Sequence, residues 1–244
     1  MKRSERHHLK ENELAAFVDR ARTVVTERRS QFVGIIVLAL VAVAAVLGYL
    51  TWRSRTESKA AALLTDALTV LEAQVATPAI AAPGQTAPTP PAGTYQSVQA
   101  KLEAAVPKLT AVYTQYPSTQ SAVAARYHAA NALAVLGRRA EAEARYKEVA
   151  GEGGFYGQMA RLGLADLFAD AGQHDQAIAI YKELSGDPGA AVPVDGVLMQ
   201  LGRVYAKAGR RSEAQQTFTR IVQDFPDSLY VADARREIET LKKS

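Results

Sequence analysis

The chain contains no cysteine, and this absence removes several classes of site at once. Without thiols there is no disulfide framework, no thiolate metal site and no cysteine nucleophile. Histidine is also scarce, and the four residues are His7, His8, His128 and His174. The first two are neighbours that do not converge on one ion, and no third ligand accompanies them. We therefore predict no metal site.

Motifs of catalysis are missing as well. The 244 residues contain no glycine-rich phosphate loop, no nucleophile elbow and no paired-histidine helix. We expect no catalytic residues, no cofactor and no small-molecule substrate. The alternative is a hydrolase with an unrecognised site, which predicts an activity that depends on Asp166 or His128.

Positive charge is concentrated in one short region. The formal net charge is +4, and residues 1–31 supply +3 of it, from eight Lys or Arg and five Asp or Glu. The rest of the chain is nearly neutral and has no basic face studded with aromatic residues, which nucleic-acid binding needs. We predict protein partners and no nucleic acid.

Residues 32–50 carry no charged side chain. Nineteen residues make a helix of roughly 28 Å, close to the roughly 30 Å hydrocarbon core of a bilayer. Tyr49 and Trp52 stand at one end, where aromatic side chains favour the headgroup layer. A buried core helix would show a polar stripe, and a signal peptide would have a shorter leader and a small-residue cleavage site. We therefore predict one uncleaved transmembrane helix at residues 32–50.

The distribution of Lys and Arg predicts the orientation of this span. Eight basic residues precede it, and Arg53, Arg55 and Lys59 follow it, which favours a cytoplasmic N-terminus. Within this leader, residues 1–31, apolar side chains recur at three- and four-residue spacing and predict an amphipathic helix. This helix either contacts lipid headgroups or a membrane complex, or only leads into the span. Its apolar residues are Leu14, Phe17, Val18, Ala21, Val24 and Val25.

Two segments of opposite character follow the span. Residues 51–75 are rich in Ala and Leu and free of Gly and Pro, which predicts a juxtamembrane helix continuing from the membrane. Residues 76–95 hold five prolines and two glycines, so we predict a linker there.

From residue 96 onward the sequence repeats. The turn glycines Gly137, Gly172 and Gly209 lie 35 and 37 residues apart. In each copy a small residue stands seven positions before the glycine and an alanine stands five positions after it. These intervals match the signature of the tetratricopeptide repeat. The clearest copy consists of Leu198, Leu201, Gly202, Tyr205, Gly209, Ala214, Phe218 and Pro226.

The repeats predict an all-α fold: a single transmembrane helix followed by a tetratricopeptide-type α-solenoid of about three to four helical hairpins. We assign residues 96–244 to this array, with a C-terminal capping helix over 229–242. Residues 57–75 are expected to pair with the helix around Ala105 and Leu109 as an earlier hairpin. Small residues let paired helices approach, and aromatic residues such as Tyr146 fill the space between hairpins.

The first helix of each hairpin is expected to line a concave face. Side chains one position after the small residue, three before it, or one turn away should point there. These residues are predicted to form a protein-binding groove: Tyr127, Asn131, Met159, Leu162, Asp166, Met199, Arg203 and Lys207. The two methionines would suit apolar binding because their side chains are flexible, or they fill gaps between hairpins.

The span at 32–50, the Ala-rich helix and the repeats together resemble the ancillary subunit of the bacterial SecYEG translocon, whose repeat domain is shared with cell-division coordinator proteins. The resemblance implies a single-pass protein of the bacterial inner membrane with a periplasmic C-terminal domain. It also implies an adaptor or chaperone-like role near the export channel, with translocon subunits and exported or envelope proteins as partners. The alternative is a scaffold in another envelope complex, for outer-membrane assembly, division or polysaccharide export.

Overall fold

A computed structural model describes residues 29–76, 93–187, 189 and 191–243, with side chains from residue 33 onward. The chain divides into two compact units, residues 1–55 and 56–244. The predicted amphipathic helix of the leader and most of the predicted linker at 76–95 lie outside the described residues.

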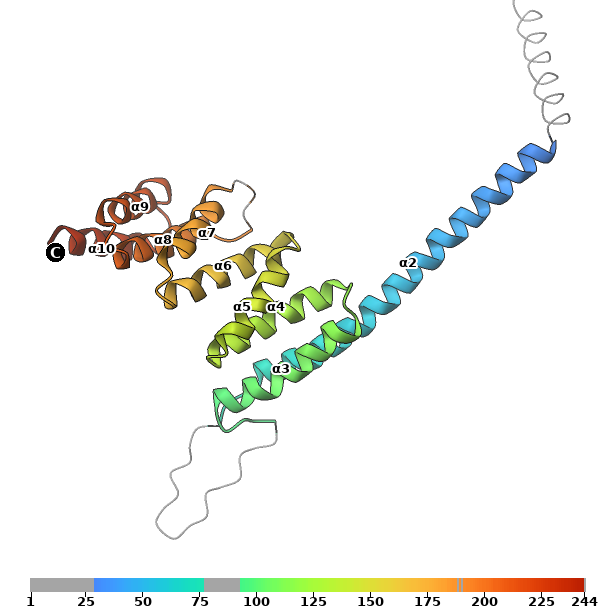
Figure 1. The fold of residues 1–244 in the computed structure, drawn as a ribbon, viewed down its shortest axis with the longest axis horizontal. Helices are drawn as coiled ribbons and strands as arrows, with labels where there is room; N and C mark the ends of the chain where they lie inside the picture. The colour runs from blue at the N-terminus through green and yellow to red at the C-terminus, as the bar shows by residue number, and fades with distance from the viewer. Residues whose placement is uncertain (1–28, 77–92, 188, 190, 244) are drawn as a thin grey trace, which may run out of the picture. The chain divides into compact units, whose positions relative to one another are not determined.

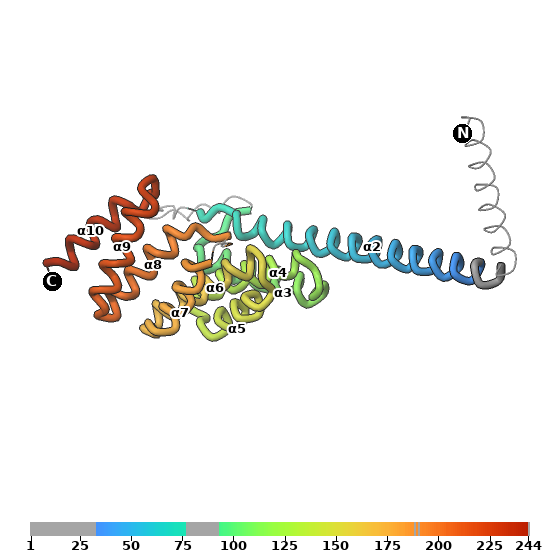
Figure 2. The backbone as a smooth tube through the Cα atoms, turned by 90° about the horizontal axis from the view of Figure 1, so that it is seen from above, coloured from blue at the N-terminus to red at the C-terminus, as the bar shows by residue number. Residues whose placement is uncertain are grey.

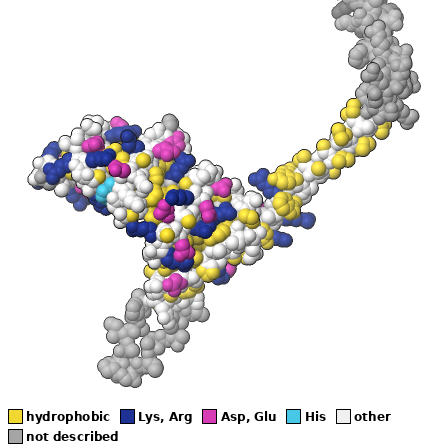
Figure 3. Space-filling model, viewed as in Figure 1, with side chains coloured by type: hydrophobic (Ala, Val, Ile, Leu, Met, Phe, Trp, Pro, Cys, Tyr) yellow, Lys and Arg dark blue, Asp and Glu magenta, His cyan; other side chains and the backbone are white. Residues whose placement is uncertain are grey.

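Helix α2 runs over Arg29–Glu72 and joins the predicted membrane and juxtamembrane helices into one helix of 44 residues. Between residues 33 and 50 every side chain is exposed, including Leu38 at 72%. Figure 3 shows this apolar surface on an otherwise uncovered helix. An all-round apolar helix needs a nonpolar surrounding, and this one is long and apolar enough to cross a membrane. A signal sequence near an N-terminus can also be long and apolar enough for this.

The second unit is an array of antiparallel helical hairpins, which makes the fold all-α and of the tetratricopeptide-solenoid type. Among the described residues the one β-bridge joins Val75 and Tyr95. Figures 1 and 2 show the helices following one another along the array. After α2 they are α3 (Val98–Gln115), α4 (Gln120–Val135), α5 (Arg139–Ala150), α6 (Gly154–Asp170), α7 (His174–Gly186), α8 (Val194–Lys207), α9 (Arg211–Asp224) and α10 (Val231–Lys243).

The last part of α2, from residue 56, forms the first hairpin with α3. Ala60 and Ala67 are fully buried in one cluster with Leu109 of α3 and Ala129 of α4. The carboxylate of Glu57 accepts hydrogen bonds from the backbone N–H groups of residues 120 and 121, which open α4. A carboxylate at this place satisfies free N–H groups and opposes the positive end of the helix dipole.

The turn glycines adopt the backbone conformation that the sequence predicts. Gly137, Gly172 and Gly209 each have φ of +74°, directly after the first helix of their hairpins. This left-handed region strains residues that carry a Cβ atom, so glycine ends these helices at little cost. The same turn thus closes all three hairpins.

The core lies within and between the hairpins, and each of the last three hairpins buries one aromatic residue of its second helix. Tyr146, Tyr181 and Phe218 are 4%, 1% and 0% exposed. A Cβ atom added to Gly202 would lie 2.4 Å from the ring of Phe218, which only glycine tolerates. At the C-terminal end α10 adds Ala234 to the buried cluster.

Candidate functional site

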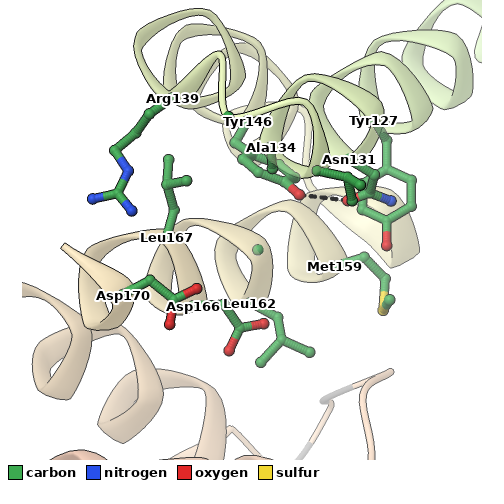
Figure 4. Close-up of a pocket in the computed structure, with 13 residues that line it drawn as sticks. Tyr127, Asn131, Ala134, Arg139, Tyr146, Met159, Leu162, Asp166, Leu167 and Asp170 are labelled. Atoms are coloured by element: carbon green, nitrogen blue, oxygen red, sulfur yellow. Dashed lines mark hydrogen bonds between the residues drawn. The ribbon is translucent and has the colours of Figure 1, made fainter. Parts of the chain in front are cut away.

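A groove of about 460 Å³ lies where α4 and the start of α5 face α6. Figure 4 shows its two walls, with α4 and α5 on one side and α6 on the other. The lining combines aromatic and aliphatic side chains with a few polar groups, and it remains open to solvent. The residues are Tyr127, Asn131, Ala134, Val135, Gly137, Arg139, Tyr146, Met159, Leu162, Gly163, Asp166, Leu167 and Asp170.

Five of the eight residues predicted for the binding face meet in this groove. These are Tyr127, Asn131, Met159, Leu162 and Asp166. They come from two successive first helices, α4 and α6, which also contact each other directly. The predicted positions, one after the small residue and three before it, therefore do line the groove on α4 and α6.

The other three predicted residues lie elsewhere, and the prediction for Met199 is wrong. Its side chain is 1% exposed and belongs to the same buried cluster as Ala234 of α10. Met199 therefore fills space between helices and does not line a groove. Arg203 forms an ion pair with Glu237 of α10, at 3.9 Å between Nε and Oε1. Lys207 is exposed at the end of α8.

Two tyrosines of the second helices reach back to the groove with their hydroxyl groups. Tyr146 donates a hydrogen bond to Oδ1 of Asn131, and Tyr181 donates one to Oδ1 of Asp166, each at 2.5 Å. Acceptor and tyrosine stand 15 positions apart in both repeats. Each bond fixes a polar groove side chain to the aromatic residue that fills the core behind it.

Burial shifts the acid–base behaviour of these groups. Partial desolvation raises the pKa of Asp166, because its carboxylate opens to the groove but has protein atoms on its other sides. The hydrogen bond from Tyr181 opposes this shift, and the nearby charge of Asp170 adds to it. Desolvation also raises the pKa of Tyr146 and of Tyr181. Both hydroxyl groups therefore remain protonated donors at neutral pH.

An aromatic cluster adjoins the groove at Tyr127. Its ring lies 5.6 Å from that of Tyr156 and 6.4 Å from that of Tyr146, between centroids. His128 touches the same cluster, and burial lowers the pKa of its imidazole. Within the described segments no three His, Asp or Glu side chains gather as metal ligands do. The neighbourhood offers aromatic surface for contact.

Sequence reasoning missed several groove residues, among them Arg139, Asp170 and Tyr146. Asp170 lies one helical turn after Asp166, so the i, i+4 rule would have found it. The constant interval of 15 residues from Asn131 to Tyr146 and from Asp166 to Tyr181 could have predicted the two hydrogen bonds. Arg139 is the first residue of α5, a second helix of a hairpin, and the predicted stripe covered only the first helices.

The sequence of residues 168–238 matches the family model described as tetratricopeptide repeat. The match runs from the end of α6 to α10, where the turn glycines and buried aromatics have just been described. This part of the array matches the tetratricopeptide repeat family, and the helical fold is of the same type. Repeats of this family generally mediate protein–protein interaction, and this fold is typically a non-catalytic scaffold. No curated protein matches the chain.

One solved structure supports the fold. A tetratricopeptide repeat protein from Parabacteroides merdae aligns with 17% identity and a TM-score of 0.50, over 59% of this chain and 54% of that one. The alignment thus spans about half of that protein. The nearly identical TPR-like repeats of a putative kinesin light chain from Podosopora anserina align with 18% identity and a TM-score of 0.48, over 59% and 78% of the two chains.

Proposed function

We propose that this tetratricopeptide-repeat protein is a membrane-anchored adaptor that holds segments of other proteins in the groove between α4 and α6. The observation that carries the proposal is the groove itself, which is open, has apolar and aromatic walls and contains fixed polar groups. Such a combination suits recognition of a polypeptide, since apolar walls supply affinity and placed polar groups supply orientation.

The anchor in this proposal is the apolar part of α2. Its side chains from residue 33 to 50 are exposed, so a bilayer would cover surface that water disfavours. The basic excess before the span supports a cytoplasmic N-terminus and an array on the opposite side. We assign residues 51–75 to the connection with the array, 76–95 to a linker and 96–244 to the repeats.

The finer part of the proposal concerns the place of action. The resemblance to the ancillary translocon subunit supports a periplasmic array at the bacterial inner membrane, beside the Sec export channel. Its partners would be translocon subunits and exported or envelope proteins. A periplasm-dependent reporter fused after Ser244 is expected to be active, and an inactive reporter alongside an active cytoplasmic one would overturn this location.

Photo-crosslinking in intact cells tests the binding role. The reactive side chain replaces Val135, which lines the groove and is 70% exposed, so the core is undisturbed. The matched control carries it at Gln216, an exposed position of α9 outside the groove. We expect adducts with translocon subunits or exported precursors from position 135 and few from position 216.

Each outcome has a distinct meaning. Adducts from position 135 with a defined set of other envelope proteins, and none with the channel, would replace the export role by the scaffold role. Equal and sparse adducts from both positions would contradict the groove as a binding site. An activity that depends on Asp166 or His128 would overturn the adaptor proposal as a whole.

A further inference from the structure

Two carboxylates line the groove and remain exposed to solvent in the free protein. Asp166 and Asp170 stand one helical turn apart on α6, and both line the groove. Figure 4 shows them on the same wall, below the helices that carry Tyr127 and Arg139. Their closeness is also visible in the pKa of Asp166, which the charge of Asp170 raises.

The remaining lining divides the groove into a polar part and an apolar part. Tyr127, Met159 and Leu162 are partly buried and present ring, thioether and aliphatic surface to it. Arg139 is the single basic residue among the lining residues, so two aspartates and one arginine leave a formal charge of −1. A ligand that covers this surface must bring apolar groups and compensate a negative charge.

We propose that the groove takes an extended polypeptide segment carrying a Lys or Arg side chain, whose cationic group pairs with Asp166 and Asp170. A neighbouring apolar side chain of the segment packs against Tyr127, Met159 and Leu162. This inference rests on the proposed function and names the chemistry of the segment that the groove selects. Covering the groove removes water from both aspartates, which a cation compensates and an anionic segment would make worse.

The repeats themselves supply a control for this charge. Asn131 occupies in the first repeat the position that Asp166 occupies in the second, and each accepts a hydrogen bond from a tyrosine 15 positions later. The replacement Asp166→Asn therefore keeps an accepting oxygen and recreates an arrangement that this chain already folds around. The reciprocal change Asn131→Asp keeps the acceptor too and adds one negative charge to the groove.

The experiment uses the full chain in detergent micelles and a library of random twelve-residue peptides. Bound peptides are sequenced for the wild type, Asp166→Asn, Asn131→Asp and the control Asp224→Asn, which removes a carboxylate at the end of α9, away from the groove. We expect Lys and Arg to be enriched beside an apolar residue. Asp166→Asn should lower that enrichment about two- to fivefold, the range for a partly exposed ion pair. Asn131→Asp should raise it, and Asp224→Asn should leave it unchanged.

The outcomes separate the two proposals. Peptides enriched for apolar residues without a basic preference, or with the same preference in Asp166→Asn as in the wild type, would overturn the cationic segment and leave the adaptor function intact. No enrichment above a control of micelles without the protein would overturn the adaptor function in the groove, and this inference with it. Unchanged circular dichroism spectra of the variants show that each array is folded.

Discussion

The second and third repeats share one backbone plan and differ at a linked pair of positions. In the second repeat Tyr181 donates to Asp166, whereas Phe218 and Arg203 stand at the same interval of 15 in the third. The third repeat has lost the donor and the acceptor together, and Arg203 instead pairs with Glu237 of α10. The spacing of small and aromatic residues thus sets the fold, while the polar pair changes as a unit.

This comparison also separates the open part of the array from the closed part. At α4 and α6 the equivalent stripe lines a groove, but at α8 it is occupied by the buried Met199 and the paired Arg203. A capping helix must cover the last hairpin because its apolar face would otherwise meet water. The side chains suited to binding a partner therefore remain accessible at α4 and α6.

The largest expected effect concerns the buried aromatic residue of the second helix, which is Tyr181 in the second repeat and Phe218 in the third. Replacing Phe218 by Ala should lower the free energy of unfolding by about 3–5 kcal/mol, since the ring is fully buried and leaves a cavity. Urea unfolding of the full chain in micelles, followed by circular dichroism, measures it. Leu229→Ala is the control at a 95% exposed position and should stay within about 0.5 kcal/mol. Similar losses for both would contradict the assignment of the core.

A smaller effect distinguishes the two glycine–ring contacts. A Cβ atom at Gly202 would lie 2.4 Å from Phe218, and one at Gly163 would lie 2.6 Å from Tyr146. Gly202→Ala should cost about 1–3 kcal/mol because the buried ring has nowhere to move. Gly163→Ala should cost less, since Tyr146 can shift into the groove. Gly186→Ala, with open space around it, is the control, and a larger cost at Gly163 would contradict the open groove.

Introducing the tyrosine and its acceptor into the third repeat tests whether the two positions act as a unit. Phe218→Tyr alone places a hydroxyl donor near Arg203, another donor, and should cost about 1 kcal/mol or more. Adding Arg203→Asn supplies an acceptor at the position that Asn131 holds in the first repeat. We expect a favourable coupling of at least about 0.5 kcal/mol in the double-mutant cycle. Strictly additive effects would show that the two positions do not form a unit.

The smallest effect is a pH dependence. Because the pKa of Asp166 is raised in the folded chain, the folded state holds this proton more tightly than the unfolded state. Its contribution to stability is therefore lost as pH rises from the unfolded pKa of about 3.9 through the folded value. Asp166→Asn should be slightly more stable than the wild type at pH 7, with the difference shrinking below about pH 4. A difference that grows on acidification would contradict the raised pKa.

Much of the fold followed from spacing alone. The turn at Gly137, Gly172 and Gly209 was predictable because a left-handed backbone selects glycine at a fixed interval. The groove residues on α4 and α6 were predictable because a helix repeats its faces every 3.6 residues. Met199 escaped this reasoning, because the spacing within α8 does not show which of its side chains the neighbouring helices bury. Arg139 escaped it because it opens α5, whereas the predicted face was built from the first helices of the hairpins.

The most direct test of the groove uses the absence of native cysteine. A single cysteine replaces Val135 at the groove, or Gln216 outside it, and its alkylation rate is measured on the full chain with and without the most enriched library peptide. We predict that the peptide slows alkylation at position 135 and leaves the rate at position 216 unchanged. Protection at position 216 alone, or an unchanged rate at position 135 with the peptide bound, would contradict it.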